Sequence, residues 1–201
     1  MKPVRQILLG LSLALVELLF VPLAKADGIV VTDTTTGSGS LDGTVFLNAL
    51  VTLTLVGDTT NVTRTTVFQL PGTATVSVGG VGSDTFTDNV QVVVNQTFAD
   101  GGFSDFTNPT AIIFTSNPVF VTYSLTSSID PLSGISALGL PSVDNTVHGT
   151  FNLKSAGTST FTATVATPEP SSLLMLGISL LALVGLSWRR NSLATSRSVL
   201  S

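Results

Sequence analysis

The sequence predicts an all-β domain, an antiparallel two-sheet sandwich that is jelly-roll-like or Ig-like, between an N-terminal signal helix and a C-terminal transmembrane helix. Two observations predict the sandwich. Apolar and polar residues alternate with a period of two through most of residues 27–167, and turn-forming pairs separate the alternating runs. A third observation predicts the flanking helices, because an apolar run lies near each end of the chain.

The alternating runs indicate roughly eight to ten short strands, each with one apolar face. In the run over residues 45–56, every odd position from Val45 to Leu55 is apolar. The other predicted apolar faces are Val62, Thr66, Phe68 and Leu70; Ala74, Val76 and Val78; Val90, Val92, Val94 and Phe98; Ile112 and Phe114; Val119, Val121, Tyr123 and Leu125; Val147, Gly149, Phe151 and Leu153; and Phe161, Ala163 and Val165.

Turn-forming pairs are expected to connect these strands. They are Gly57-Asp58, Pro71-Gly72, Gly79-Gly80, Asp88-Asn89, Gly101-Gly102, Asn117-Pro118 and Ala156-Gly157. Two stretches break the alternation. Thr32–Gly43 is rich in Thr, Gly and Ser and is expected to be a loop, flexible or packed along an edge. Ile129–Pro141 is expected to be a long loop with at most one short helical turn.

Residues 1–26 have the features of a secretory signal peptide. Lys2 and Arg5 precede the apolar run Ile7–Leu23, and Ala24 and Ala26 provide the small residues of a signal-peptidase site. Cleavage is expected after Ala26, so the segment that follows is expected to be exported.

Composition limits the chemistry of the exported segment, residues 27–167. The chain has no cysteine, which excludes disulfides, thiolate metal sites and cysteine nucleophiles. Ten aspartates against only Arg64 and Lys154 give this segment a formal charge of −8. Such a charge disfavours nucleic acid and anionic lipid surfaces as partners.

The stretch Thr167–Arg190 combines a proline turn, an apolar run and two adjacent arginines. Pro168 and Pro170 each hold the preceding residue extended, so a helix cannot cross this point. Residues 171–188 carry no charge and would form a helix roughly 27 Å long, close to the about 30 Å of a hydrocarbon core. We therefore expect a transmembrane helix over 171–188 and a short cytoplasmic tail over 192–201.

Pro168-Glu169-Pro170, the apolar run and the Arg189-Arg190 pair resemble the PEP-CTERM sorting signal of Gram-negative bacteria, over residues 168–191. The resemblance implies that an exosortase, a membrane-embedded cysteine protease, recognises and processes the chain. It also implies export through the inner membrane, C-terminal anchoring there and then delivery to the cell surface or the extracellular matrix. The residues after the arginines depart from the family, whose signals usually end sooner.

The C-terminal stretch lacks the features of two other kinds of anchor. A GPI signal ends in its apolar tail, and the nearest match to a Gram-positive sorting signal, Leu70–Ala74, lies in mid-chain and lacks the final glycine. A permanently anchored single-pass protein remains an alternative.

The sequence predicts no catalytic residue and therefore no enzyme. His148 is the only histidine and is expected on the outward face of its strand. Gly134–Gly139, around Ser136, is one residue too long for a nucleophile elbow.

Paired carboxylates are the remaining candidates for chemistry. Asp84 with Asp88, or Asp100 with Asp105, could act in glycoside hydrolysis or bind calcium through oxygen ligands. Neither pair has EF-hand or RTX spacing, and aspartates are common at turns. We assign no cofactor and no metal ligand, and calcium is the one cofactor left open.

The sequence as a whole predicts a non-enzymatic surface or extracellular-matrix protein, transiently anchored at the membrane and sorted through its C-terminal signal. The expected partners are signal peptidase, an exosortase, the inner membrane and extracellular polysaccharide. The alternative is a carbohydrate- or calcium-binding sandwich module, permanently anchored as a single-pass protein. Sugar stacking is disfavoured, because the domain has no Trp, Tyr123 is the only Tyr and most Phe are expected on inward faces.

Overall fold

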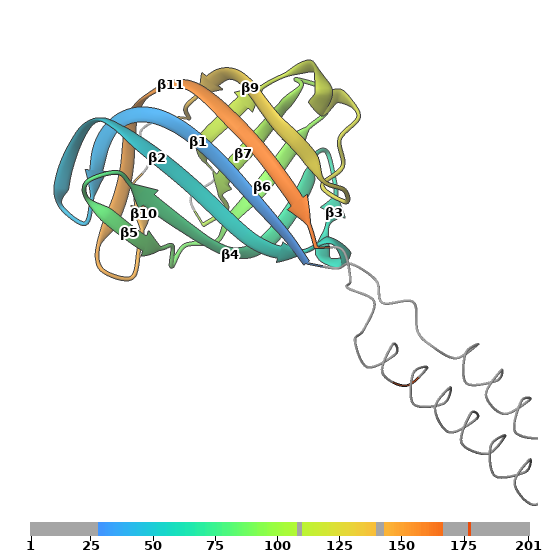
Figure 1. Cartoon of the computed structure of the whole chain (residues 1–201), viewed down its shortest axis with the longest axis horizontal. Coiled ribbons are helices and arrows are strands. Elements are labelled where there is room, and N and C mark those ends of the chain that lie inside the picture. The colour runs from blue at the N-terminus through green and yellow to red at the C-terminus, as the bar shows by residue number, and fades with distance from the viewer. Residues whose placement is uncertain (1–27, 108–109, 140–142, 167–176, 178–201) are drawn as a thin grey trace, which may run out of the picture. The chain divides into compact units, whose positions relative to one another are not determined.

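A computed structural model describes residues 28–107, 110–139, 143–166 and 177. Its strands form one antiparallel sheet that closes on itself (Figure 1). The ring contains eight strands in the order β1-β2-β4-β6-β7-β8-β9-β11, and β11 pairs back with β1. The predicted signal peptide and, apart from residue 177, the predicted transmembrane segment lie outside the described residues.

The ring is a meander in which neighbours in the chain are mostly neighbours in the sheet. Three short strands add to its margins, since β3 and β5 pair with β4 and β10 pairs with β11. The elements are β1 (Gly28–Leu41), β2 (Thr44–Asp58), the 3₁₀ helix η1 (Thr59–Asn61), β3 (Thr63–Arg64), β4 (Phe68–Val78), β5 (Gly82–Thr85), β6 (Val90–Asn95), β7 (Asp100–Asp105), β8 (Thr110–Ser116), the 3₁₀ helix η2 (Pro118–Val121), β9 (Ile129–Ala137), β10 (Asp144–Asn145) and β11 (Thr150–Val165).

The predicted two-sheet sandwich is wrong, because the fold is a closed barrel. In a sandwich the two sheets keep free edges, whereas here β1 pairs with β11 from Ile29↔Val165 to Leu41↔Phe151. A strand with one apolar face fits either architecture, since a closed eight-stranded sheet buries that face in its interior. The alternation could therefore predict the strands but not the closure.

Two segments predicted as loops are strands of the barrel. Most of Thr32–Gly43 belongs to β1, and most of Ile129–Pro141 belongs to β9. The inward positions of β1 include Asp33 and Thr35, which are buried but polar, so the apolar alternation that begins at Ile29 and Val31 stops there. Pairing with β2 on one side and β11 on the other holds it in place.

Some predicted turns also lie inside strands. Gly101-Gly102 is part of β7, Pro71-Gly72 of β4 and Ala156-Gly157 of β11. The two glycines of β7 are required by close packing, because a Cβ at Gly101 would overlap the Phe120 ring and one at Gly102 would overlap the Ile113 carbonyl.

The apolar face predicted over residues 45–56 is interrupted by a β-bulge. The β1–β2 register shifts between Gly37↔Ala49 and Gly39↔Phe46, and Asn48 takes a positive φ of 48°. As a result Phe46 points inward while Val45 and Leu47 are exposed. The predicted inward positions Val51, Leu53 and Leu55 are buried.

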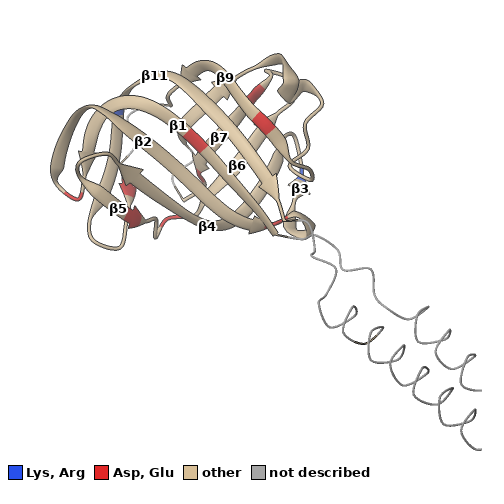
Figure 2. Ribbon diagram, viewed as in Figure 1, with Lys and Arg blue, Asp and Glu red and all other residues tan. Residues whose placement is uncertain are grey.

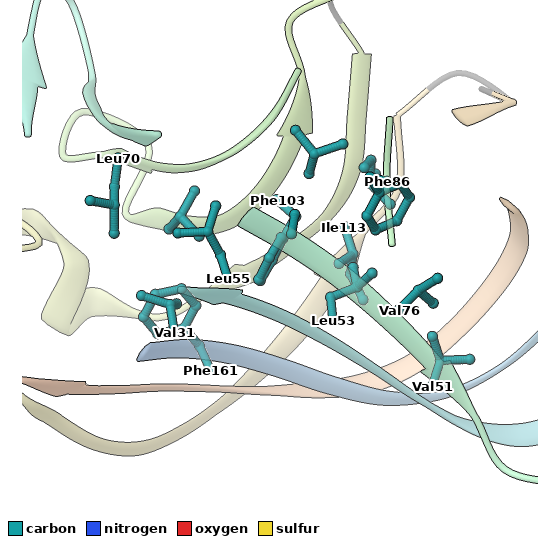
Figure 3. Packing of buried hydrophobic residues seen from close by; sticks show 14 of the residues in the cluster. Val31, Val51, Leu53, Leu55, Leu70, Val76, Phe86, Phe103, Ile113 and Phe161 are labelled. Carbon is teal, nitrogen blue, oxygen red and sulfur yellow. The ribbon is translucent and has the colours of Figure 1, made fainter. Parts of the chain in front are cut away.

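Apolar side chains fill the interior of the barrel (Figure 3). The inward faces predicted for β4 (Ala74, Val76, Val78), for β6 (Val90, Val92, Val94) and for β11 (Phe151, Leu153, Phe161, Ala163) are confirmed. The run predicted as a strand at 119–125 instead contains η2, whose Phe120 packs edge-on against Phe161. Phe46 and Phe86 pack against Phe151 further along β11.

Residues Ala26–Ala166 form one compact unit. Within the part of the chain that the structure describes, no helix combines the length and the apolar character needed to cross a membrane.

Candidate functional site

The residues predicted to direct export and sorting lie outside the described residues. They are Pro168, Glu169 and Pro170, the basic pair Arg189 and Arg190, and the signal-peptidase site at Ala24 and Ala26. The structure does show where the barrel begins and ends. The Ala166 backbone N–H donates to the Gly28 carbonyl over 2.8 Å, so the first and last residues of the barrel are adjacent. Only Thr167 separates this hydrogen bond from the predicted motif.

Asp84 and His148 are in contact, although 64 residues separate them in the chain. The His148 backbone N–H donates to Asp84 Oδ2 over 2.8 Å, and His148 Nδ1 lies 3.0 Å from Oδ1. The Thr85 backbone N–H also donates to Oδ1 over 2.8 Å. Asp84 is buried and the imidazole of His148 is exposed. The hydrogen bonds to the carboxylate link β5 to the segment that precedes β11.

Burial raises the pKa of Asp84, but the hydrogen bonds from His148 and Thr85 outweigh it and hold the pKa below its usual 3.8. Because the pKa of Asp84 is lower in the folded protein than in the unfolded chain, the carboxylate stabilises the fold at pH values above about 3.8. This contribution is lost as the pH falls towards the folded pKa.

We expect Asp84→Asn to lower the melting temperature at pH 7 by several degrees, because an amide nitrogen would face the backbone N–H donor of either His148 or Thr85. The variant should also lose less stability than the wild type below about pH 4. Thermal melts followed by circular dichroism between pH 7 and pH 2 test this, with Asp130→Asn on the exposed side of β9 as the control. Equal losses in acid for Asp84→Asn and the wild type would contradict it.

The other predicted carboxylates have separate partners. Asp88 Oδ2 accepts from the Asn145 backbone N–H over 2.6 Å, and Asp100 Oδ1 accepts from the Ser116 hydroxyl over 2.6 Å. Asp105, at the far end of β7 from Asp100, accepts from the Thr107 backbone N–H over 2.7 Å. In the described ranges, no three His, Cys, Asp or Glu side chains come together in a way that could hold a metal ion. Within each pair the two carboxylates therefore have different hydrogen-bond partners.

A polar cluster inside the barrel was missed by the sequence reasoning. It joins Asp33 on β1, Thr115 on β8 and Ser159 on β11, all of them buried. The Thr115 hydroxyl donates to Asp33 Oδ2 over 3.0 Å and lies 2.6 Å from the Ser159 hydroxyl. Burial raises the pKa of Asp33 to about 7. The available signal was the position of Asp33, two residues after Val31 and in phase with Ile29.

A surface groove was also missed. Arg64, Phe68 and Gln96 are among the residues that line it, and Phe98, predicted to face inward, is 73% exposed at the nearby β6–β7 connection. The available signal was the isolation of Arg64, one of only two basic residues in an acidic segment.

Comparison with known proteins identifies the tail. Residues 166–191 match the family model of the PEP-CTERM protein-sorting motif, which confirms the resemblance. No curated protein and no solved structure matches the chain. The motif marks the chain as an exported protein that an exosortase sorts and that is anchored at the membrane through its C-terminal tail.

Proposed function

We propose that this chain is a non-enzymatic protein of the cell surface or the extracellular matrix, which is held at the membrane by its tail until an exosortase processes it. The observation that carries the proposal is the sorting motif at residues 166–191, joined directly to the end of β11. Export delivers the barrel, and the barrel is the part that remains after processing.

Two features of the barrel support a role without catalysis. Apolar side chains occupy its interior, so the ring encloses a packed core. The exposed His148 is held by Asp84, whereas the Ser136 hydroxyl donates to the Gly157 carbonyl on another strand. In the described part of the chain, no serine hydroxyl is hydrogen-bonded to His148, as a nucleophile with its base would require.

The test is to replace Pro168, Glu169 and Pro170 together by alanine and to identify both chain ends by mass spectrometry in the native host. The wild-type chain should begin at Asp27 and end near Pro168–Pro170, because an exosortase reads the motif. The triple variant should keep its C-terminus at Ser201 and stay in the membrane fraction.

A Ser198→Ala change, beyond the matched motif, is the control and should leave processing unchanged. A wild-type chain that still ends at Ser201 would contradict the proposal and favour a permanently anchored protein.

A further inference from the structure

The groove lies where the β3–β4 connection meets the end of β6. Its volume is about 160 Å³, and it is lined by Arg64, Thr66, Phe68, Val94, Gln96 and Thr97, among others. The sheet holds three of these residues in register, because Arg64 pairs with Phe68 and Phe68 pairs with Val94. The groove is therefore preformed by backbone pairing.

Arg64 provides an unused positive charge in this groove. Its guanidinium carbon lies 4.9 Å from the centroid of the Phe68 ring. Among the described residues, Arg64 has no carboxylate partner and donates no side-chain hydrogen bond. Stacking on a ring orients the planar guanidinium and leaves its N–H groups free for a ligand, and this N–H fork matches a carboxylate. Figure 2 shows acidic residues on several elements and a basic residue on β3.

The remaining walls offer groups that bind hydroxyls and apolar surface. Gln96 Nε2 donates to the Tyr123 carbonyl over 3.0 Å, which fixes the amide and leaves its oxygen to accept a hydrogen bond. The Asn95 side chain accepts from the backbone N–H groups of Thr97 and Phe98, over 3.1 and 3.3 Å, and so fixes the turn that exposes the Phe98 ring. The groove therefore carries a cation and an amide acceptor, and an exposed aromatic ring follows its lining residue Thr97 in the chain.

We propose that this groove binds an acidic sugar, with the ligand carboxylate on Arg64 and ring hydroxyls on Gln96 and the neighbouring threonines. A free small carboxylate would satisfy Arg64 but would leave the Gln96 acceptor and the hydroxyls of Thr66 and Thr97 unused. A polyphosphate would meet one cation in a segment of formal charge −8. The volume is below that of drug-sized pockets and suits a single sugar ring. The inference depends on the geometry of the barrel and not on processing of the tail.

The test uses the full chain, ¹⁵N-labelled in a non-ionic detergent, titrated with galacturonate, galactose and acetate. Galacturonate should shift the amide signals of Arg64, Phe68 and Gln96 with a Kd on the order of 1 mM, as expected for a ligand of this size. Galactose lacks the carboxylate and acetate lacks the ring, so each should bind at least about tenfold more weakly. Higher salt should weaken the binding of galacturonate.

Arg64→Gln should weaken galacturonate binding at least about tenfold, whereas Lys154→Gln, at the other basic residue that the structure describes, should leave it unchanged. Arg64 is exposed, so Arg64→Gln should keep the melting temperature of the wild type, which separates a lost contact from a lost fold. The proposal is overturned if acetate binds as tightly as galacturonate, if Arg64→Gln binds normally, or if no signal near the groove shifts at 20 mM galacturonate.

Discussion

The wild-type protein is expected to lose about 4 kcal/mol of its unfolding free energy between pH 4 and pH 8, and Asp33→Asn is expected to show no such loss. Asp33 is 1% exposed and lies in the barrel wall opposite Leu53 of β2 and Phe161 of β11. The Thr115 hydroxyl is its side-chain partner, and no hydrogen bond reaches Oδ1. Leu53 and Phe161 cannot offset a negative charge there, and the hydrogen bond from Thr115 offsets it only in part.

The direction of the effect follows from linkage. Burial raises the pKa of Asp33 from 3.8 to about 7, so the folded protein binds a proton that the unfolded chain has released between these values. This contribution to stability is fully present below the unfolded pKa and is lost as the pH rises through the folded pKa. At ~1.4 kcal/mol per pKa unit, the shift corresponds to about 4 kcal/mol.

Asparagine cannot ionise, so Asp33→Asn should unfold with a free energy that stays constant across this range. At pH 4 it should be less stable than the wild type by about 1–3 kcal/mol, because its amide N–H groups lack an acceptor. At pH 8 it should be the more stable protein. Urea unfolding at intervals of one pH unit measures both curves, with Asp130→Asn as the control. Parallel curves for Asp33→Asn and the wild type would contradict the prediction.

The Asp33 stretch shows why the architecture could not be predicted from the sequence. Alternation identifies a strand only where its inward residues are apolar, as in Ala74, Val76 and Val78 of β4. In β1 the inward side carries Asp33 and Thr35, and the side-chain partner of Asp33, Thr115, lies 82 residues away in the chain. Because Thr32–Gly43 lacks the apolar alternation of a strand, the sequence does not indicate the β1–β11 pairing that closes the barrel.

The bulge at Asn48 shows a second limit. One extra residue moves every later side chain to the opposite face, so Phe46 and Val51 both point inward although they differ in parity. Val45 and Leu47 share their odd positions with Val51, Leu53 and Leu55 in the sequence. In the sheet they point to the opposite face. An asparagine that tolerates positive φ was the local sign of this bulge.

The sorting motif and the groove also differ in how far the sequence predicts them. Pro168-Glu169-Pro170 is contiguous, so its chemistry could be recognised in the sequence and was confirmed by the motif match. The groove depends on pairing between segments about 30 residues apart, which brings Arg64 and Phe68 to the end of β6. The period of two predicts Phe98 on the inward face with Val94, because the pattern does not show the turn that begins at Asn95.

Phe161→Ala is expected to cost about 3–5 kcal/mol of unfolding free energy, a large share of the 5–15 kcal/mol typical of a domain. Phe161 is fully buried on β11, the strand that closes the barrel with β1. Its ring packs edge-on against Phe120 of η2, with centroids 5.0 Å apart, and against Tyr123 at 6.3 Å. Alanine would leave a cavity where the paired strands β1 and β11 meet η2 and the segment after η2.

Phe98→Ala is the matched control, because it removes the same atoms from a side chain that is 73% exposed. It should change the unfolding free energy by no more than about 0.5 kcal/mol. Urea unfolding of the two variants at pH 5, where Asp33 is protonated in the folded protein, keeps the two predictions separate. Amide hydrogen exchange should then show protection lost along both β1 and β11 in Phe161→Ala, because each strand is the hydrogen-bonding partner of the other. If Phe161→Ala instead cost no more than Phe98→Ala, the seam between β1 and β11 would not belong to the cooperative core, and the ring would open without loss of the fold.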